Sequence, residues 1–288
     1  MLTLEGRRCL VTGSTSGIGR EIAFGLARLG ADLIIVGRTE AKCKQNVEEI
    51  RLQRGDRNGV LSYFAADLSS QDEVRRLAQY ALDSCPSLEV LVNNAGVFEA
   101  NRDVTMEGIE RTFAVNHLAP FLLTGILADR LKAAQSARVV TTSSVAHRGA
   151  TVDFDDINFE RRRYSGLRAY GQSKLANILF TRELAKRLNK TGVTANCFHP
   201  GGVRTNLINN SPILYRIIWA IASPFFASPS QGASTGVYLA SSPDVAGKSG
   251  KYFVKQEETT PSVAALDDKS AQRLWTLSEE MTGLQFTT

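Results

Sequence analysis

Short apolar runs rich in β-branched residues alternate along most of the chain with longer segments of helical periodicity. Runs of about four to eight such residues are typical of buried strands, and apolar residues three and four positions apart are typical of helices. The pattern predicts strands in RCLVT (8–12), DLIIVG (32–37), VLSYFAAD (60–67), LEVLVNN (88–94), ARVVTTSS (137–144) and VTANCFHP (193–200). It predicts helices over 18–29, 40–54, 70–83, 107–133 and 167–189.

The predicted strands are apolar on both faces, and helices join them. Such strands are typical of a parallel sheet, because crossover connections cover both of its faces with helices. We therefore expect an α/β fold, a single doubly wound Rossmann domain over residues 1–288. The stretch 206–230 interrupts the alternation just after a strand end, where ligand clefts form, so we interpret it as a substrate lid. An apolar arm packed in the core or in a dimer contact would explain this stretch equally well.

Composition and charge narrow the function classes. The chain is 43% hydrophobic and 22% charged, as is ordinary for a folded protein. Its net charge is +5, but the basic residues are spread out, with ERRRY (160–164) as the one dense run. This distribution argues against nucleic-acid binding and fits a small anionic ligand. The cysteines, at 9, 43, 85 and 197, form no CxxC pair, so we expect neither zinc nor disulfides and favour a cytoplasmic location.

The hydropathy pattern does not favour membrane insertion. The N-terminus runs almost at once into a predicted strand, so we expect no signal peptide. The most apolar window, 212–229, is interrupted by Arg216, Pro224 and Pro229 and is too short to span a bilayer. Peripheral membrane contact through this window stays open.

A glycine-rich loop follows the first predicted strand and opens the first predicted helix. The segment LVTGSTSGIGREIA carries glycines at 13, 17 and 19. Glycine lets a backbone turn sharply and approach a ligand, while free amides and the helix dipole favour phosphate. The strand, loop and helix stand in the order that dinucleotide binding requires.

The residue after the second predicted strand then indicates which dinucleotide is bound. NAD sites usually carry a carboxylate there, whereas an arginine accommodates a 2′-phosphate. Here Arg38 follows Gly37, so we favour NADP(H) and leave NAD(H) open.

Tyr170 and Lys174 stand four residues apart in RAYGQSKLANILF (168–180), which puts both side chains on one helix face. The segment YGQSK is part of an ordered series with TGSTSGIG (12–19), NNAG (93–96), AVNH (114–117), TTSS (141–144) and HPGGVRT (199–205). The series resembles the short-chain dehydrogenase/reductase family over essentially the whole chain. The segments SSVAHRGA, SGKYF and AQRLWTLSEEMTGL further resemble its retinol dehydrogenase group.

The resemblance implies four catalytic residues: Asn116, Ser144, Tyr170 and Lys174. Tyr170 would donate a proton to a carbonyl or accept one from an alcohol. Ser144 would hydrogen-bond the reacting oxygen, with Ser143 as the structural neighbour that faces the other way on the strand. Asn116 would hold a proton-relaying water, although an asparagine within a helix can also serve packing. A cation about 4 Å from a phenolate stabilises it by about 4 kcal/mol at an effective dielectric near 20. We therefore expect Lys174 to lower the Tyr170 pKa from about 10 towards about 7.

The resemblance also implies a set of cofactor contacts. The glycine loop would lie along the pyrophosphate, Arg38 beside the adenosine phosphate and Asp67 near adenine. Lys174 would bond the nicotinamide ribose, while Val203 and Thr205 would anchor the carboxamide and nearby phosphates. The full set is Gly13, Ser14, Ser16, Gly17, Ile18, Gly19, Arg38, Asp67, Leu68, Asn93, Ala95, Gly96, Tyr170, Lys174, Pro200, Gly201, Val203 and Thr205.

The implied reaction is hydride transfer between the nicotinamide and a carbonyl or alcohol. Apolar residues around 213–226 suggest a lipophilic substrate, such as a retinal-like aldehyde, a steroid or a xenobiotic ketone. His117, His147 and His199 form no HExxH group, so we expect no metal, and we interpret His147 as structural or as a substrate contact. A pigment-type reductase and a catalytically silent, cofactor-sensing interaction protein are the alternatives. A homo-oligomer stays open.

Overall fold

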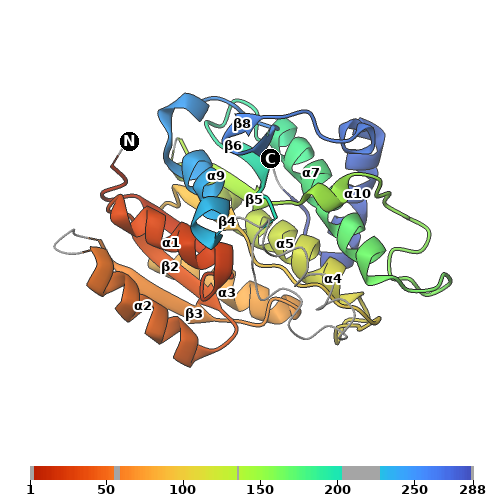
Figure 1. The fold of residues 1–288 in the computed structure, drawn as a ribbon, viewed down its shortest axis with the longest axis horizontal. Coiled ribbons are helices and arrows are strands. Elements are labelled where there is room, and N and C mark those ends of the chain that lie inside the picture. Colours follow the sequence, from red (N-terminus) through yellow and green to blue (C-terminus); the bar gives the residue numbers. More distant parts are fainter. Residues whose placement is uncertain (1–2, 55–58, 135, 203–227, 287–288) are drawn as a thin grey trace.

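One mixed sheet runs through the computed structural model, which describes residues 3–54, 59–134, 136–202 and 228–286 (Figure 1). The strands are β1 (Arg8–Thr12), β2 (Asp32–Gly37), β3 (Leu61–Ala65), β4 (Val90–Asn93), β5 (Arg138–Thr142), β6 (Thr194–His199), β7 (Tyr252–Val254) and β8 (Glu257–Glu258). Their order is β3-β2-β1-β4-β5-β6-β7-β8. β1 to β7 are parallel and β8 pairs antiparallel with β7. The strand order reverses between β1 and β4, and in doubly wound sheets ligands bind at this switch point, outside the carboxyl ends of the strands.

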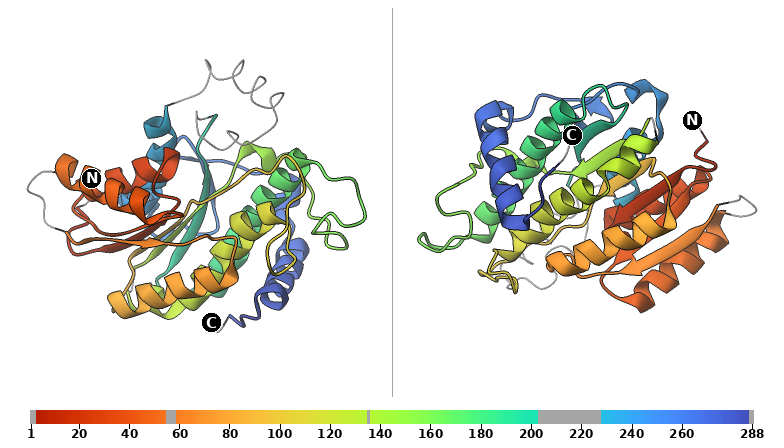
Figure 2. Two further views of the ribbon diagram at one scale, coloured as in Figure 1. Left: turned by 90° about the horizontal axis from the view of Figure 1, so that it is seen from below. Right: turned by 180° about the vertical axis from the view of Figure 1, so that it is seen from behind.

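Helices cover both faces of the sheet. They are α1 (Gly17–Arg28), α2 (Glu40–Arg54), α3 (Gln71–Ser84), α4 (Arg111–Phe113), α5 (Ala119–Ile126), α6 (Ala128–Ala133), α7 (Gly166–Arg187), α9 (Pro229–Ser241) and α10 (Asp268–Thr282). Short helical segments are η1 (Ala114–Leu118), η2 (Val145–His147), η5 (Pro243–Val245) and η6 (Val263–Leu266). Figure 2 shows α1, α2 and α9 on one side of the sheet and α3, α5 and α7 on the other.

Successive residues of each strand contribute to the two opposite cores. In β1, Cys9 and Val11 pack in the core under α1 and α9, whereas Leu10 packs in the core under α3 and α5. This alternation buries both faces of every central strand, and it explains why the strands read as continuous apolar runs. α10 adds a further layer outside α7, where the Trp275 ring lies 5.0 Å from Phe121 and stacks on Phe180 at 5.9 Å.

The strands predicted from the pattern are confirmed, with ends that differ by at most a few residues. The continuous helix predicted over 107–133 is wrong, because this stretch divides into α4, the π-helical η1, α5 and α6. Pro120 stands at the start of α5 and lacks the N–H that an uninterrupted α-helix would need there. The lid predicted over 206–230 lies outside the described residues, apart from 228–230, where Ser228 caps α9 and residues 229 and 230 begin it.

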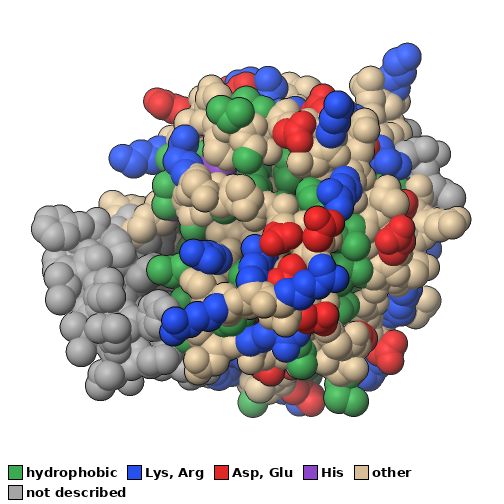
Figure 3. Space-filling model, turned by 90° about the vertical axis from the view of Figure 1, so that its right-hand side faces the viewer, with side chains coloured by type: hydrophobic (Ala, Val, Ile, Leu, Met, Phe, Trp, Pro, Cys, Tyr) green, Lys and Arg blue, Asp and Glu red, His purple; other side chains and the backbone are tan. Residues whose placement is uncertain are grey.

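Charged groups of both signs share the surface. On the face in Figure 3, Lys and Arg side chains are interspersed with Asp and Glu side chains. Within the ERRRY run, Arg162 pairs with Asp153 at 2.9 Å and with Asp156 at 3.6 Å, so part of this run is neutralised locally. In the part of the chain that the structure describes, none of the helices has the length and apolarity that crossing a membrane requires.

Candidate active site

The glycine loop lies against the end of β4 at the carboxyl edge of the sheet. Gly13 has φ +65°, and a Cβ at this position would lie 2.8 Å from the Ala95 Cα, so glycine is required here. Ser14 fixes the loop to β2, because its hydroxyl donates to the Val36 carbonyl at 3.2 Å and accepts from the Val36 N–H at 2.9 Å. The fully buried Ser14 is thus used within the protein, since its backbone N–H also donates to the Val36 carbonyl and its own carbonyl accepts from the Asn46 side chain.

The N-terminus of α1 presents its amides without a side-chain cap. Ser16 occupies the N-cap position, makes no capping hydrogen bond, and no acidic residue stands in the first turn. Gly19 lies so close to Asn94 that a Cβ would come within 2.2 Å of its Nδ2. A helix N-terminus with unsatisfied N–H groups and the positive end of the dipole favours an anion. The loop and α1 therefore form a close-approach surface suited to phosphate.

Thr12 and Asn94 join three strand ends and were not predicted as site residues. The Thr12 hydroxyl accepts from the backbone N–H groups of Asn94 at 3.0 Å and of Ala95 at 3.1 Å. The Asn94 amide donates to the Thr12 carbonyl at 3.0 Å and accepts from the Thr142 hydroxyl at 3.3 Å. Asn93, in contrast, is buried and donates to Thr124 in the core at 3.0 Å. Adjacent residues at a strand end face opposite ways, so the Asn93 side chain faces the core and the Asn94 side chain faces the neighbouring strand ends, and the cofactor contact of Asn93 stays a prediction.

Tyr170 and Lys174 lie together on α7, facing the end of β5. The Lys174 ammonium lies 5.5 Å from the Tyr170 ring centroid and donates to the Thr142 carbonyl at 3.1 Å. A Cβ at Gly96 would lie 3.4 Å from this ammonium and 3.3 Å from the Asn116 Oδ1, so the NNAG turn packs directly on the pair. The Lys174 side chain is 3% exposed, and burial lowers its pKa to about 8.

The pKa of Tyr170 shifts in the direction opposite to the one expected. Burial raises this pKa to about 12, while a hydrogen bond with the Ser144 side chain lowers it by less. Transfer of a phenolate out of water is costly, and the nearby ammonium is engaged by the Thr142 carbonyl. The expectation that Lys174 brings the Tyr170 pKa towards 7 is therefore wrong for this site. The half-buried Tyr170 is a neutral phenol, which is a proton donor, at neutral pH.

Ser143 and Ser144 face opposite directions, as strand alternation predicts. The buried Ser143 hydroxyl donates to the backbone carbonyl of Lys174 at 2.8 Å and fixes α7 to the sheet. Ser144 is only partly buried, interacts with Tyr170 and accepts from the Ala146 N–H at 3.2 Å. Of the two serines, Ser144 is the one that the fold directs to the tyrosine.

Asn116 lies in the π-helical η1 and uses its side chain within the protein. Its Oδ1 accepts from the Val97 N–H at 2.7 Å, and its Nδ2 donates to the Val97 carbonyl at 3.0 Å and to the Ser173 hydroxyl at 2.9 Å. The Asn116 side chain is thus satisfied by protein groups, and the proton-relaying water at Asn116 stays a prediction. Pro120, four residues on, has no N–H to donate to the Asn116 carbonyl in an α-helical pattern.

The predicted adenosine side holds two arginines around one carboxylate. Arg38 is exposed directly after β2, and Asp67 is exposed two residues after the end of β3, followed by the buried Leu68. Burial acts to raise the Asp67 pKa, but hydrogen bonds from Ser69 and the charges of Arg111 and Arg38 hold it below its usual range. Arg111, at 3.7 Å from the Asp67 carboxylate, was not predicted because it lies far away in sequence.

The remaining predicted contacts follow β6. Pro200 and Gly201 lie at the end of this strand, and Gly201 has φ +86°. Val203 and Thr205 lie outside the described residues. Among the described residues there is no cluster of three or more His, Cys, Asp or Glu side chains that could hold a metal.

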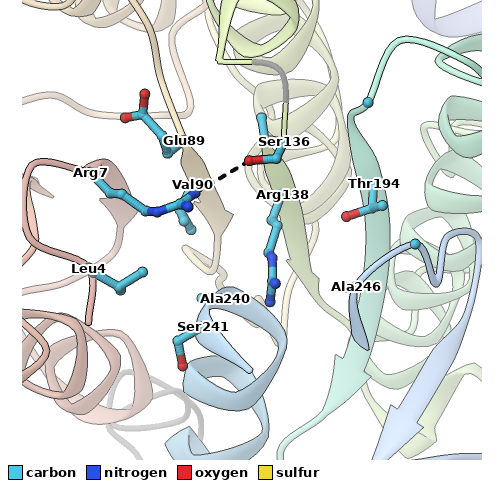
Figure 4. Close-up of a pocket in the computed structure, with 13 residues that line it drawn as sticks. Leu4, Arg7, Glu89, Val90, Ser136, Arg138, Thr194, Ala240, Ser241 and Ala246 are labelled. Atoms are coloured by element: carbon cyan, nitrogen blue, oxygen red, sulfur yellow. Dashed lines mark hydrogen bonds between the residues drawn. The ribbon is translucent and has the colours of Figure 1, made fainter. Parts of the chain in front are cut away.

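One cavity among the described residues lies at the opposite edge of the sheet. It measures about 120 Å³ and lies at the beginnings of the strands, beside Val90, Arg138 and Thr194 (Figure 4). Arg7 reaches across its rim and donates to the Ser136 hydroxyl at 3.4 Å. None of the predicted site residues lines this cavity, so we assign the candidate active site from the geometry around Tyr170 and not from cavity size.

Comparison with known proteins agrees with this geometry. A family model described as short chain dehydrogenase matches residues 7–212. Retinol dehydrogenase 14 from Mus musculus is 43% identical, over 98% of this chain and 87% of that protein. Retinol dehydrogenase 12 from Mus musculus is 42% identical, over 98% of this chain and 88% of that protein.

Solved structures share the fold. An uncharacterized protein from Mycobacterium paratuberculosis has a TM-score of 0.81 and 31% identity, and the match covers 100% of this chain and 97% of that one. The RhlG/NADP active-site complex from Pseudomonas aeruginosa has a TM-score of 0.69 and 27% identity, with 87% of this chain and 95% of that one covered. The chain, with its Rossmann-like sheet and its full-length similarity to retinol dehydrogenases, belongs to the short-chain dehydrogenase/reductase family.

Proposed function

We propose that this protein is an NADP(H)-dependent oxidoreductase that interconverts a carbonyl and an alcohol on a lipophilic small molecule, with Tyr170 as the general acid and base. One observation carries the proposal. The half-buried Tyr170 interacts with Ser144 and lies beside the buried Lys174, at the sheet edge where the glycine loop also ends. A neutral phenol, a second hydroxyl and a buried cation around one point are the groups that protonation of a carbonyl oxygen needs.

The residues at this edge fit a phosphorylated dinucleotide. The uncapped N-terminus of α1 and the positive-φ Gly13 and Gly17 would hold the pyrophosphate. The exposed guanidinium of Arg38 would contact the 2′-phosphate, and the ammonium of Lys174, packed on Gly96, would contact the nicotinamide ribose. The NADP in the RhlG complex supports the choice of the phosphorylated cofactor. When bound, the reduced nicotinamide supplies the hydride.

The proton step is carried by this chain. As the substrate carbonyl carbon gains a hydride, its oxygen becomes negative and takes the proton of the Tyr170 hydroxyl. Ser144 donates a hydrogen bond that orients the same oxygen, and Lys174 stabilises the phenolate that is left behind. A proton from solvent then restores the phenol. Because burial holds the Tyr170 pKa at about 12, the tyrosine starts a reductive cycle as a proton donor at neutral pH.

Apolar side chains support a lipophilic substrate. Phe98, which is buried, meets the Tyr170 ring edge to face at 5.9 Å. Val145 follows Ser144 directly and is 51% exposed. A lipophilic aldehyde or ketone would bury apolar area against the exposed Val145 side chain, from which a polar substrate would gain little. The names of the retinol dehydrogenase relatives support the same substrate class.

The cysteines support a reducing compartment such as the cytoplasm. All four are free and buried, which is the usual state of cysteine in a reducing environment. We include this location in the proposal.

The test is a Tyr170→Phe variant of the purified chain. Wild-type protein and variant are compared for oxidation of NADPH and of NADH, followed by nicotinamide absorbance, with a panel of lipophilic aldehydes, steroid ketones and xenobiotic ketones. The variant should lose about 100- to 10,000-fold in turnover, the usual worth of a general acid. Its NADPH dissociation constant, measured by fluorescence, should change little.

Each alternative gives a different result. Turnover that survives in Tyr170→Phe would refute the role of the tyrosine. Tight NADPH binding by the wild type without turnover of any compound would favour the silent, cofactor-sensing protein. Turnover limited to a large planar pigment, followed by the absorbance of the pigment, would favour the pigment reductase.

A further inference from the structure

His147 is a buried histidine that stands three residues after Ser144, at the end of η2. It is 0% exposed, so it is inaccessible to a substrate in this structure. Its Nδ1 lies 2.6 Å from the Ser144 backbone carbonyl oxygen. Its Nε2 lies 3.1 Å from the backbone nitrogen of Ser262, whose N–H donates to it. Both ring nitrogens are therefore engaged by backbone groups.

These two partners determine the tautomer of the ring. A carbonyl oxygen can only accept, so Nδ1 must carry the hydrogen. A backbone N–H can only donate, so Nε2 must present its lone pair. The neutral Nδ1–H imidazole satisfies both bonds. An imidazolium would turn a second N–H towards the Ser262 N–H and lose that bond.

The surroundings of the ring disfavour a positive charge. Burial lowers the pKa of His147, the Ser144 carbonyl opposes this, and the Arg148 cation lowers it further. His199 on β6 belongs to the same group of charges. Burial is the largest cause of its lowered pKa, and His147 and Arg148 lower this pKa further. From β7, the Tyr252 ring meets the imidazole edge to face at 5.1 Å. The charged or titratable groups around His147 are thus Arg148, His199 and the phenol of Tyr252.

The ring links the serine to a distant part of the chain. The Ser144 carbonyl also accepts the backbone N–H of His147 at 3.2 Å, so His147 holds this carbonyl twice. Ser262 leads into η6, which packs on α7, the helix that carries Tyr170 and Lys174. Arg148 makes a second link to the same segment by donating to the Thr260 carbonyl at 3.0 Å.

From these contacts we infer that His147 is a positioning residue, which holds Ser144 in register with Tyr170 only while its imidazole is neutral. The inference deepens the proposed function and rests on it. His147 touches no reacting atom. Its hydrogen bonds fix the backbone from which the Ser144 hydroxyl reaches the tyrosine, and protonation of the ring releases the Ser262 end of that support.

Three substitutions separate the parts of this inference. His147→Gln keeps one amide donor and one acceptor but cannot be protonated. His147→Phe keeps an aromatic ring against Tyr252 and removes both hydrogen bonds. Arg148→Ala removes the neighbouring link to Thr260 and leaves His147 intact, so it is the matched control. NADPH binding and the circular dichroism spectrum are recorded for all three.

The expected kinetic results are specific. His147→Phe should lose about 100-fold in kcat, the cost of a misplaced reacting group, with an unchanged NADPH dissociation constant. Arg148→Ala should stay within about threefold of wild type, since an exposed polar contact contributes little. In wild-type protein, kcat should fall reversibly only well below pH 6.5, because burial holds the pKa of His147 below the ordinary histidine value. His147→Gln should keep most of its neutral-pH kcat and lack this acid limb. An unchanged kcat in His147→Phe, or an acid limb that persists in His147→Gln, would overturn the inference.

A readout that needs no turnover keeps the two proposals distinguishable. Nitrogen NMR of ¹⁵N-histidine-labelled protein reports the tautomer, and the His147 signals are those missing from His147→Gln. An Nδ1–H signal that persists unprotonated well below pH 6.5 is the expected result. An Nε2–H tautomer, or titration near 6.5 as in an exposed histidine, would overturn the inference even if no substrate is turned over. Absence of turnover in the wild type would instead contradict the proposed function alone.

Discussion

Raising the pH should switch off the proposed reaction through Lys174, not through Tyr170. Burial lowers the Lys174 pKa to about 8 and raises the Tyr170 pKa to about 12, so only the lysine changes charge between pH 7 and 10. With a pKa of about 8, roughly 90% of the lysine is charged at pH 7 and roughly 10% at pH 9. Because the ammonium stabilises the phenolate that forms in the proton step, kcat for reduction should fall about tenfold for each pH unit above about 8.

The same shift distinguishes lost catalysis from lost folding. The folded-state pKa of Lys174 is lower than its ordinary value of 10.5, so between the two values the unfolded chain binds more protons than the folded chain. Stability then rises with pH across that window, by up to about 1.4 kcal/mol per pH unit from this group. The enzyme should therefore lose turnover at pH 9 while Lys174 itself makes the fold more stable.

The assay is single-turnover reduction with saturating NADPH and a carbonyl substrate that does not titrate, measured from pH 6.5 to 10. Urea unfolding at each pH gives the stability in parallel. Lys174→Arg is the comparison, because a guanidinium stays charged throughout and should remove the alkaline limb. A wild-type rate that stays flat to pH 10 would refute the reasoning, and so would a limb that persists unchanged in the arginine variant.

Three further predictions follow from individual contacts. Gly13→Ala should cost roughly 1–3 kcal/mol of stability and weaken NADPH binding, because Gly13 combines φ +65° with a Cβ position 2.8 Å from the Ala95 Cα. Gly6→Ala, at φ +71° where a Cβ meets none of the described residues, isolates the backbone strain in the same urea titration. Trp275→Ala should lose about 3–5 kcal/mol of unfolding free energy, because this side chain is 2% exposed, and kcat should be unchanged below the melting range. Arg38→Ala should raise the NADPH dissociation constant about 10- to 100-fold, the worth of a hydrogen bond to a charged group. It should leave the constant for NADH nearly unchanged, and equal losses for both cofactors would contradict the role of the arginine.

Sequence patterns recovered the parts of the fold that depend on local periodicity. β1, β2, β4, β5 and β6 were predictable because most of their residues are buried on both faces, which produces largely apolar runs, while the edge strand β3 is only partly buried and was still marked by its apolar and aromatic residues. The opposite directions of Ser143 and Ser144 followed from strand geometry alone. β7 is only three residues long and depends on its pairing with β6, so no periodic signal marks it. The interruption of the predicted 107–133 helix at η1 was also not predicted, because the π-helical turn before Pro120 depends on the packing of Asn116 against Val97.

Residues whose roles depend on contacts between distant segments were also not predicted from the sequence. Thr12 and Asn94 hold the strand ends together, and Arg111 approaches Asp67 from a distant segment. His147 looked like an ordinary loop histidine until its two backbone partners were located. A sequence pattern identifies residue types at regular spacing, whereas these roles depend on which carbonyl or amide the fold brings within about 3 Å.

The spacing of Tyr170 and Lys174 alone predicted the wrong direction for the shift of the Tyr170 pKa. A separation of four residues places Tyr170 and Lys174 on one face of a helix. Their pKa values, however, depend on how far the surrounding residues exclude water from each side chain. The result is a neutral phenol beside a cation that is ready to lose its proton. This arrangement suits catalysis better than a phenol already ionised in the resting state. A charge 5.5 Å from the centre of the ring contributes about 3 kcal/mol at an effective dielectric near 20, taking the ring centre as the position of the phenolate charge, and it does so only once the phenolate appears. The attraction between the two groups is thus realised as the proton leaves Tyr170, and an interaction that is stronger in the transition state than in the ground state is the kind that raises kcat.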